Sequence, residues 1–67
     1  MILSTQTQIK IRAMLAEMTK AEVLERLDVP EYTLDAALRG EDVPKWEGDN
    51  IFEGCEAWDV EQSKGAA

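Results

Sequence analysis

The stretch TKAEVLERLDVPEYTLDAALRG, residues 19–40, decides the fold. Thr19 followed by Glu22 has the spacing of a capping box, in which each side chain satisfies a free backbone N–H group at the start of a helix. Apolar residues then recur at helical spacing as far as Leu27. The pattern predicts a short helix that begins after Thr19, with Glu22 and Arg26 as an i, i+4 ion pair on its solvent-exposed side.

The tripeptide Asp28-Val29-Pro30 ends this helix. The residue before a proline avoids the α region, and proline suits the first turn of a following helix. We therefore predict a second helix from about Glu31 to Arg39, which Gly40 closes in the left-handed conformation. The expected apolar positions of the two helices are Ala21, Val23, Leu24, Leu27, Leu34, Ala37 and Leu38.

Upstream of this pair, the polar run Ser4-Thr5-Gln6-Thr7 can cap another helix. Behind it, Ile11, Met14, Leu15 and Met18 fall at i, i+3, i+4 and i+7. This spacing gives one apolar helical face. We expect a first helix that buries this face against the other two.

Downstream of residue 40 the helical period is lost, and the punctuating residues are Pro44, Gly48 and Gly54. The run Gly48-Asp49-Asn50 has the composition of a turn. We expect a short β-hairpin, or wing, over residues 46–60, with an irregular segment as the alternative. Within it, Glu56–Val60 is either a last strand or a helical turn.

The aromatic residues Trp46, Phe52 and Trp58 are expected to fill the core, since the chain is short of apolar bulk. An exposed one would be a hot-spot candidate for a partner surface. The expected fold is thus mainly α: a small three-helix domain over residues 1–61 with a C-terminal wing or irregular segment. Residues 62–67 are expected to form a flexible tail.

Residues 19–40 resemble the helix-turn-helix of small phage repressors of the Cro and repressor type. The segment from Gly40 to Trp46 is similar to the stretch that leads into the wing of excisionase-type proteins. Together with small size and acidity, the resemblance implies a phage or mobile-element product built on a DNA-binding scaffold. The matching positions are Leu27, Val29, Leu34 and the ending Leu38-Arg39-Gly40.

Two residues depart from that family's pattern. The turn position that is usually glycine is Asp28, which tolerates a left-handed conformation less well than glycine but better than most residues. The helix position that is normally alanine, close to the following helix, is Leu24. Either change can widen the angle between the two helices.

The composition weighs against several classes of protein. The 67-residue chain has no His and one cysteine, Cys55, so the usual metal ligands and nucleophile–base pairs are missing. We expect no enzyme activity, no cofactor and no metal, with Cys55 as a small, partly buried residue. No secretory signal or membrane-spanning run is present, which with a single cysteine indicates a cytoplasmic protein. A homodimer would be an easy way to bury more surface.

The charge is strongly negative and uneven. The formal net charge is −7. Residues 1–45 carry six basic and eight acidic residues, whereas residues 46–67 carry six acidic residues and Lys64. Such a surface repels phosphate at long range and attracts basic partners. The charge therefore favours a basic protein as the partner over nucleic acid or an anionic membrane.

The function expected from these observations is that of a small acidic regulator on a helix-turn-helix scaffold. It would bind and modulate or inhibit a basic protein, such as nucleic-acid machinery or a host defence or regulatory protein. Carboxylates would imitate phosphates, and an aromatic residue would anchor the contact. The candidate partner-binding residues are Glu31, Tyr32, Asp35, Arg39, Glu53, Glu56, Trp58 and Asp59.

The alternative is a sequence-specific DNA-binding transcriptional regulator of the Cro or excisionase type. The exposed face of the helix Glu31–Arg39 would then enter the major groove, flanked by phosphate contacts. Arg39 would read a base, or it would pair with Asp35 at i+4. The candidate DNA-binding residues are Lys10, Arg12, Lys20, Arg26, Tyr32, Thr33, Arg39 and Lys45.

Overall fold

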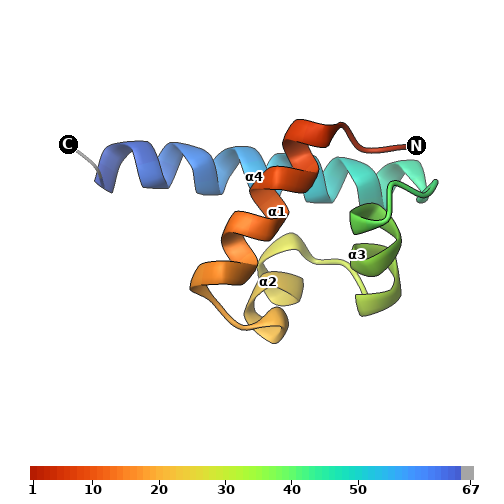
Figure 1. The fold of residues 1–67 in the computed structure, drawn as a ribbon, viewed down its shortest axis with the longest axis horizontal. Helices are drawn as coiled ribbons and strands as arrows, with labels where there is room; N and C mark the ends of the chain where they lie inside the picture. The colour runs from red at the N-terminus through yellow and green to blue at the C-terminus, as the bar shows by residue number, and fades with distance from the viewer. Residues whose placement is uncertain (66–67) are drawn as a thin grey trace.

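A computed structural model describes residues 1–65 of the chain, and these residues form helices without any strand. The elements are α1 (Thr5–Glu17), α2 (Lys20–Leu27), α3 (Glu31–Leu38) and α4 (Lys45–Gly65). The long α4 is crossed by α1, and α2 and α3 lie on one side of it (Figure 1). The expected mainly α class is therefore confirmed for the described part of the chain.

The first helix begins and buries its face as the sequence predicts. Ser4 is the N-cap of α1, and its Oγ accepts a hydrogen bond from the backbone N–H of Thr7 at 3.2 Å. Ile11 and Met14 are fully buried. The other two positions of the predicted face, Leu15 and Met18, are partly buried and pack against the same core.

The cap predicted for α2 is present in part. Thr19 Oγ1 accepts a hydrogen bond from the Glu22 backbone N–H at 3.2 Å. The Glu22 carboxylate accepts a hydrogen bond from the Thr19 hydroxyl at 3.1 Å, and not from the Thr19 backbone N–H that a capping box would use. The predicted ion pair between Glu22 and Arg26 is wrong, because α4 brings Glu61 alongside α2 and Arg26 pairs with Glu61 instead. Ala21 is exposed, contrary to its expected place in the apolar stripe.

A three-residue connection joins α2 to α3. Asp28 has φ 57° and ψ 48°, the left-handed conformation, and Pro30 is the N-cap residue of α3. Val29, between them, is buried. The predicted left-handed end after α3 is also confirmed, since Gly40 has φ 75°.

The predicted wing over residues 46–60 is wrong, because all of these residues belong to α4. Ile51, Cys55 and Trp58 are buried at i, i+4 and i+7, so one face of α4 closes the core. The run Gly48-Asp49-Asn50, expected as a turn, lies inside this helix. A helix of this length supplies the buried area that a short hairpin would otherwise have to provide.

The two glycines within α4 mark close approaches of neighbouring chain. A Cβ atom at Gly48 would lie 2.6 Å from Met1 Sδ. A Cβ atom at Gly54 would overlap Leu27 Cδ2, which is buried in the core. Both glycines therefore allow close packing; neither forms a turn.

The two glycines should respond differently to alanine. Gly48→Ala should be neutral or slightly stabilising, because the flexible, partly exposed Met1 side chain can move and alanine favours a helix by about 1 kcal/mol. Gly54→Ala should be less stable than Gly48→Ala by about 1–3 kcal/mol, since buried Leu27 must shift. Urea unfolding of both variants measures the difference. A larger loss at Gly48 would indicate a turn at that position.

The aromatic residues of α4 do not all enter the core. Trp58 is 8% exposed and buried as expected, whereas Trp46 is 65% exposed. Phe52 is also exposed. The expectation of core packing is therefore wrong for Trp46 and Phe52, because the helical period turns both away from the face that contains Ile51.

The C-terminal end of the domain differs in part from the expected tail over residues 62–67. Residues 62–65 continue α4, and residues 66–67 lie outside the described residues. None of the helices in residues 1–65 is both long enough and apolar enough to cross a membrane.

Candidate protein-binding surface

The outer face of α3 carries acidic residues that α2 neutralises. Lys20 Nζ lies 2.8 Å from Asp35 Oδ1 and 3.1 Å from Glu31 Oε2. The hydrogen bond to Asp35, followed by that to Glu31, raises the pKa of Lys20. These two carboxylates are therefore poor phosphate mimics as they stand, because one ammonium group lies between them.

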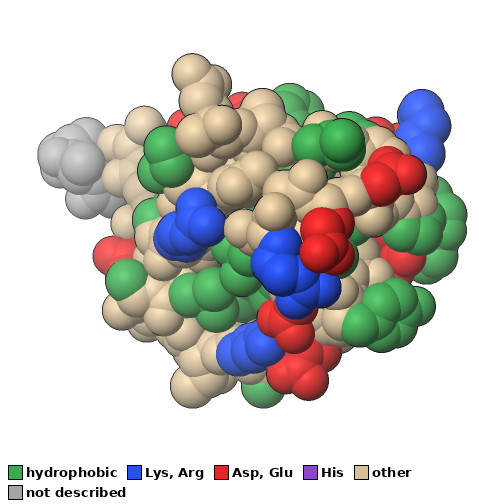
Figure 2. Space-filling model, turned by 45° about the vertical axis from the view of Figure 1, so that its right-hand side comes forward, with side chains coloured by type: hydrophobic (Ala, Val, Ile, Leu, Met, Phe, Trp, Pro, Cys, Tyr) green, Lys and Arg blue, Asp and Glu red, His purple; other side chains and the backbone are tan. Residues whose placement is uncertain are grey.

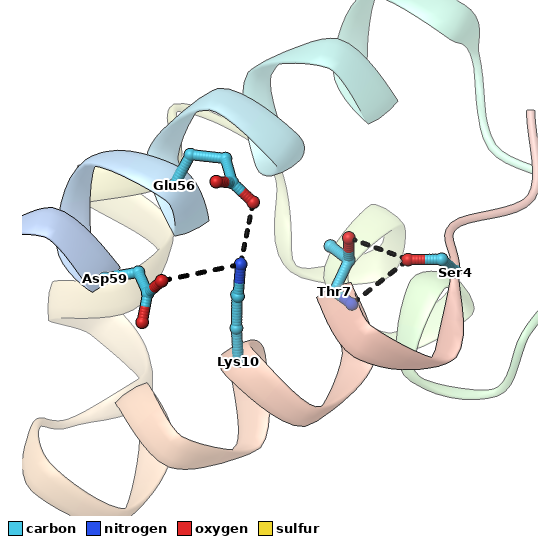
Figure 3. A network of polar contacts seen from close by, with 5 residues as sticks. All are labelled: Ser4, Thr7, Lys10, Glu56 and Asp59. Carbon is cyan, nitrogen blue, oxygen red and sulfur yellow. Dashed lines mark hydrogen bonds and ion pairs between the residues drawn. The ribbon is translucent and has the colours of Figure 1, made fainter.

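The acidic residues Glu56 and Asp59 of α4 are bound in the same way. Lys10 reaches from α1 between them, with its Nζ 2.7 Å from Glu56 Oε1 and 3.7 Å from Asp59 Oδ2 (Figure 3). The hydrogen bond to Glu56 raises the pKa of Lys10. This contact links α1 to α4. Because both carboxylates are paired with Lys10, neither is free to bind a basic partner.

Arg39 forms a local ion pair at the end of α3. Its Nε and Nη2 atoms each lie 3.1 Å from a carboxylate oxygen of Glu41. The hydrogen bonds raise the pKa of Arg39 and lower the pKa of Glu41. The alternative in which Arg39 pairs with Asp35 is wrong, because Arg39 pairs with Glu41 and Lys20 pairs with Asp35.

The remaining candidate bases also have partners within the chain. Arg12 Nη2 donates to the Leu38 carbonyl at 3.1 Å, where a cation complements the end of α3. Lys45 pairs with Asp49 one turn further along α4 at 3.1 Å. With Arg26 on Glu61, all six bases proposed as phosphate contacts are engaged, five of them by carboxylates.

Basic side chains do not gather into a continuous field on the face seen in Figure 2. They are interspersed there with acidic side chains and hydrophobic patches. Several carboxylates, by contrast, take part in no ion pair among residues 1–65. These residues are Glu17, Glu22, Glu25, Asp28, Glu47 and Glu53.

One of these carboxylates is buried and structural. Glu47 is 2% exposed, and its Oε2 accepts a hydrogen bond from Thr33 Oγ1 at 3.0 Å. Glu47 lies in the first turn of α4, where a negative charge complements the helix dipole. Thr33 is therefore buried against α4, and its hydroxyl does not face a groove of DNA. Trp58, offered as an anchor, is likewise inside the core.

The exposed aromatic residues lie where α3 and α4 begin. Tyr32 is 71% exposed and is one of the partner-binding residues that the sequence predicts. Trp46 is 65% exposed; the sequence predicts it as a core residue and as a hot-spot candidate only if it is exposed, so it is absent from the predicted partner-binding residues. Both precede the hydrogen-bonded pair Thr33 and Glu47 by one residue, so they occupy adjoining first turns. If residues 45–58 are predicted as a helix, the helical spacing places Trp46 on a different side from Ile51 and Cys55.

Cys55 is fully buried in the core, more deeply than expected. Burial raises the pKa of the Cys55 thiol from its usual 9.0 to about 11, against a smaller opposing effect of Lys10. The thiol is therefore neutral and shielded, which makes it a poor nucleophile.

The folded protein should therefore react with a thiol reagent such as Ellman's reagent only as fast as it unfolds. The raised pKa also makes stability depend on pH. The contribution of the neutral Cys55 thiol to the free energy of unfolding is fully present below pH 9.0. It should be lost as the pH rises toward about 11, because the thiol ionises in the unfolded chain at a lower pH than in the folded protein. Unfolding curves across this range, compared with Cys55→Ala, measure the effect; equal pH dependence in both proteins would contradict it.

Comparison of the chain with protein-family models, curated proteins and solved structures found no match.

Proposed function

We propose that this chain is a small acidic regulator, of phage or mobile-element origin, that uses a helix-turn-helix scaffold to bind and modulate a basic protein. Nucleic-acid machinery and host defence or regulatory proteins are the partner classes that fit. The observation that carries the proposal is the engagement of all six candidate phosphate-binding bases by groups of the chain itself.

The internal ion pairs bear on the choice between DNA and protein. Exposed ion pairs are individually weak, about 0–1 kcal/mol, so a phosphate could compete for one base. If a phosphate of DNA paired with Lys20, however, Glu31 and Asp35 would lie beside the DNA backbone without their cation. Repulsion between these carboxylates and phosphate opposes binding, whereas a basic protein meets an excess of negative charge.

The proposal is tested by affinity capture with the full chain from its native host, before and after nuclease treatment. We expect a basic protein to stay bound after nuclease and to elute with salt, because the contact is largely electrostatic. Recovery of DNA alone, lost after nuclease, would contradict the proposal.

A DNA-binding regulator of the Cro or excisionase type is the second candidate, and the connection between α2 and α3 favours it. Helix-turn-helix motifs join two helices by a short turn that often contains glycine. Here the turn contains left-handed Asp28, and Val23, Leu27, Val29, Leu34 and Ala37 are buried around it. Tyr32 would face the groove in that case, and the bases would contact phosphate after leaving their carboxylates.

A further inference from the structure

A stripe of two exposed residues and one half-buried residue follows the first half of α4. Trp46, Asn50 and Glu53 are spaced at i, i+4 and i+7, so they share one side of the helix. This side differs from the buried one that contains Ile51 and Cys55. The stripe combines a large exposed aromatic ring, an amide and a carboxylate.

Two contacts bring further groups to this stripe. Asn50 Nδ2 donates to the backbone carbonyl of Asp28 at 3.4 Å, which places the α2–α3 connection beside the middle of the stripe. The Thr33–Glu47 hydrogen bond places the start of α3, with Tyr32, beside the start of α4. We call the set Asp28, Tyr32, Trp46, Asn50 and Glu53 the aromatic–acidic surface.

The charges of this surface differ from those elsewhere on the molecule. Asp28 and Glu53 are exposed and make no ion pair among the described residues. The nearest basic residue on α4, Lys45, is paired with Asp49. Two carboxylates without an ion-pair partner, Asp28 and Glu53, are therefore linked through Asn50 and α4 to the segments that carry Tyr32 and Trp46. Lys64, the base of α4 without an ion pair among the described residues, lies eleven positions beyond Glu53.

We propose that the aromatic–acidic surface binds an arginine-bearing segment of the basic partner. A guanidinium group stacks on the faces of Trp and Tyr and makes forked hydrogen bonds to carboxylates, so one arginine side chain can use both kinds of group. Lysine offers a point charge without the planar fork. The inference rests on the proposed function and specifies where on the molecule the partner docks.

The test uses the full chain and a labelled hexa-arginine peptide with blocked ends, followed by fluorescence anisotropy at low salt. Trp46→Ala and Tyr32→Ala should each weaken binding about tenfold, as expected for aromatic hot spots. Glu53→Gln and Asp28→Asn should each weaken it about threefold. Asparagine also tolerates the left-handed conformation at position 28, so the fold is kept.

Matched controls separate this surface from overall charge. Glu17→Gln and Glu25→Gln remove one negative charge each from exposed carboxylates outside the surface, and each should change the affinity less than twofold. Trp46→Phe should retain much of the binding, and hexa-lysine should bind more weakly than hexa-arginine. Circular dichroism verifies that every variant is folded.

The outcomes distinguish the two levels of the proposal. Equal losses for Glu17→Gln and Glu53→Gln, or wild-type affinity of Trp46→Ala and Tyr32→Ala, would overturn the docking site and leave a merely acidic protein. Failure of the wild-type chain to bind either basic peptide at low salt would overturn the docking site and the proposed function together.

Discussion

Replacing Ile51 with alanine should lower the free energy of unfolding by about 2–5 kcal/mol, the range for a buried large-to-small substitution. Ile51 is fully buried at the centre of the face that α4 presents to the core. The total stability expected for a 67-residue domain is roughly 3–10 kcal/mol. The variant should therefore be close to unfolding at room temperature, as urea denaturation followed by circular dichroism would measure.

The neighbouring residue supplies the control for this prediction. Phe52 is larger than Ile51 but points away from the core and is partly exposed. Phe52→Ala should therefore cost about 1 kcal/mol or less. Comparable losses at both positions would mean that the buried face of α4 is not the one described.

Removing the hydroxyl of Thr33 should also be costly. Thr33→Val keeps the shape of the side chain but leaves the buried Glu47 carboxylate without its donor. An unsatisfied buried polar group costs about 1–3 kcal/mol, and a charged group lies at the upper end of this range. The loss is again measured by urea unfolding of the single variant.

A double-mutant cycle identifies the cause of that loss. Thr33→Val combined with Glu47→Met removes both partners, so the double variant should recover most of the stability lost in Thr33→Val alone. Independent, additive losses at the two positions would show that the hydrogen bond between α3 and α4 does not connect them energetically.

The first three helices follow from local chemistry that is visible in the sequence. Ser4 and Thr19 are caps whose donors lie three residues away, and their hydrogen bonds form in the folded protein. Asp28 and Gly40 are the residue types that tolerate the left-handed turns they adopt. Such features depend on neighbours in sequence, which is why the chain alone reveals them.

The sequence predicts a hairpin where α4 forms, because glycine is typical both of turns and of close contacts between helices. Gly48 and Gly54 indicate turns when only their backbone freedom is considered, yet here they provide room for Met1 and Leu27. That room depends on which distant segments lie against α4, and local sequence does not contain this information. The spacing of Ile51, Cys55 and Trp58 was the available signal for a helix.

The sequence predicts which residue types could form the candidate site, but it does not predict which of them are free to bind a partner. Tyr32 and Glu53 were named from sequence, but Glu31, Asp35, Glu56 and Asp59 are bound by lysines from other helices. Those partners lie far away in sequence, so only the tertiary structure identifies which carboxylates are taken. The aromatic–acidic surface likewise depends on contacts that α3 and the α2–α3 connection make with α4.

The most direct test of the central claim, that this scaffold serves a basic protein and not DNA, is a titration of labelled duplex DNA with the full chain at low salt. Non-specific binding by DNA-binding proteins commonly has a Kd of about 1–100 µM at physiological salt and strengthens as salt falls. Because its six candidate phosphate-binding bases are engaged and its net charge is −7, the chain should leave pooled genomic duplexes unshifted over this range. Retarded DNA, with an affinity that falls with salt as several phosphate contacts require, would contradict the claim.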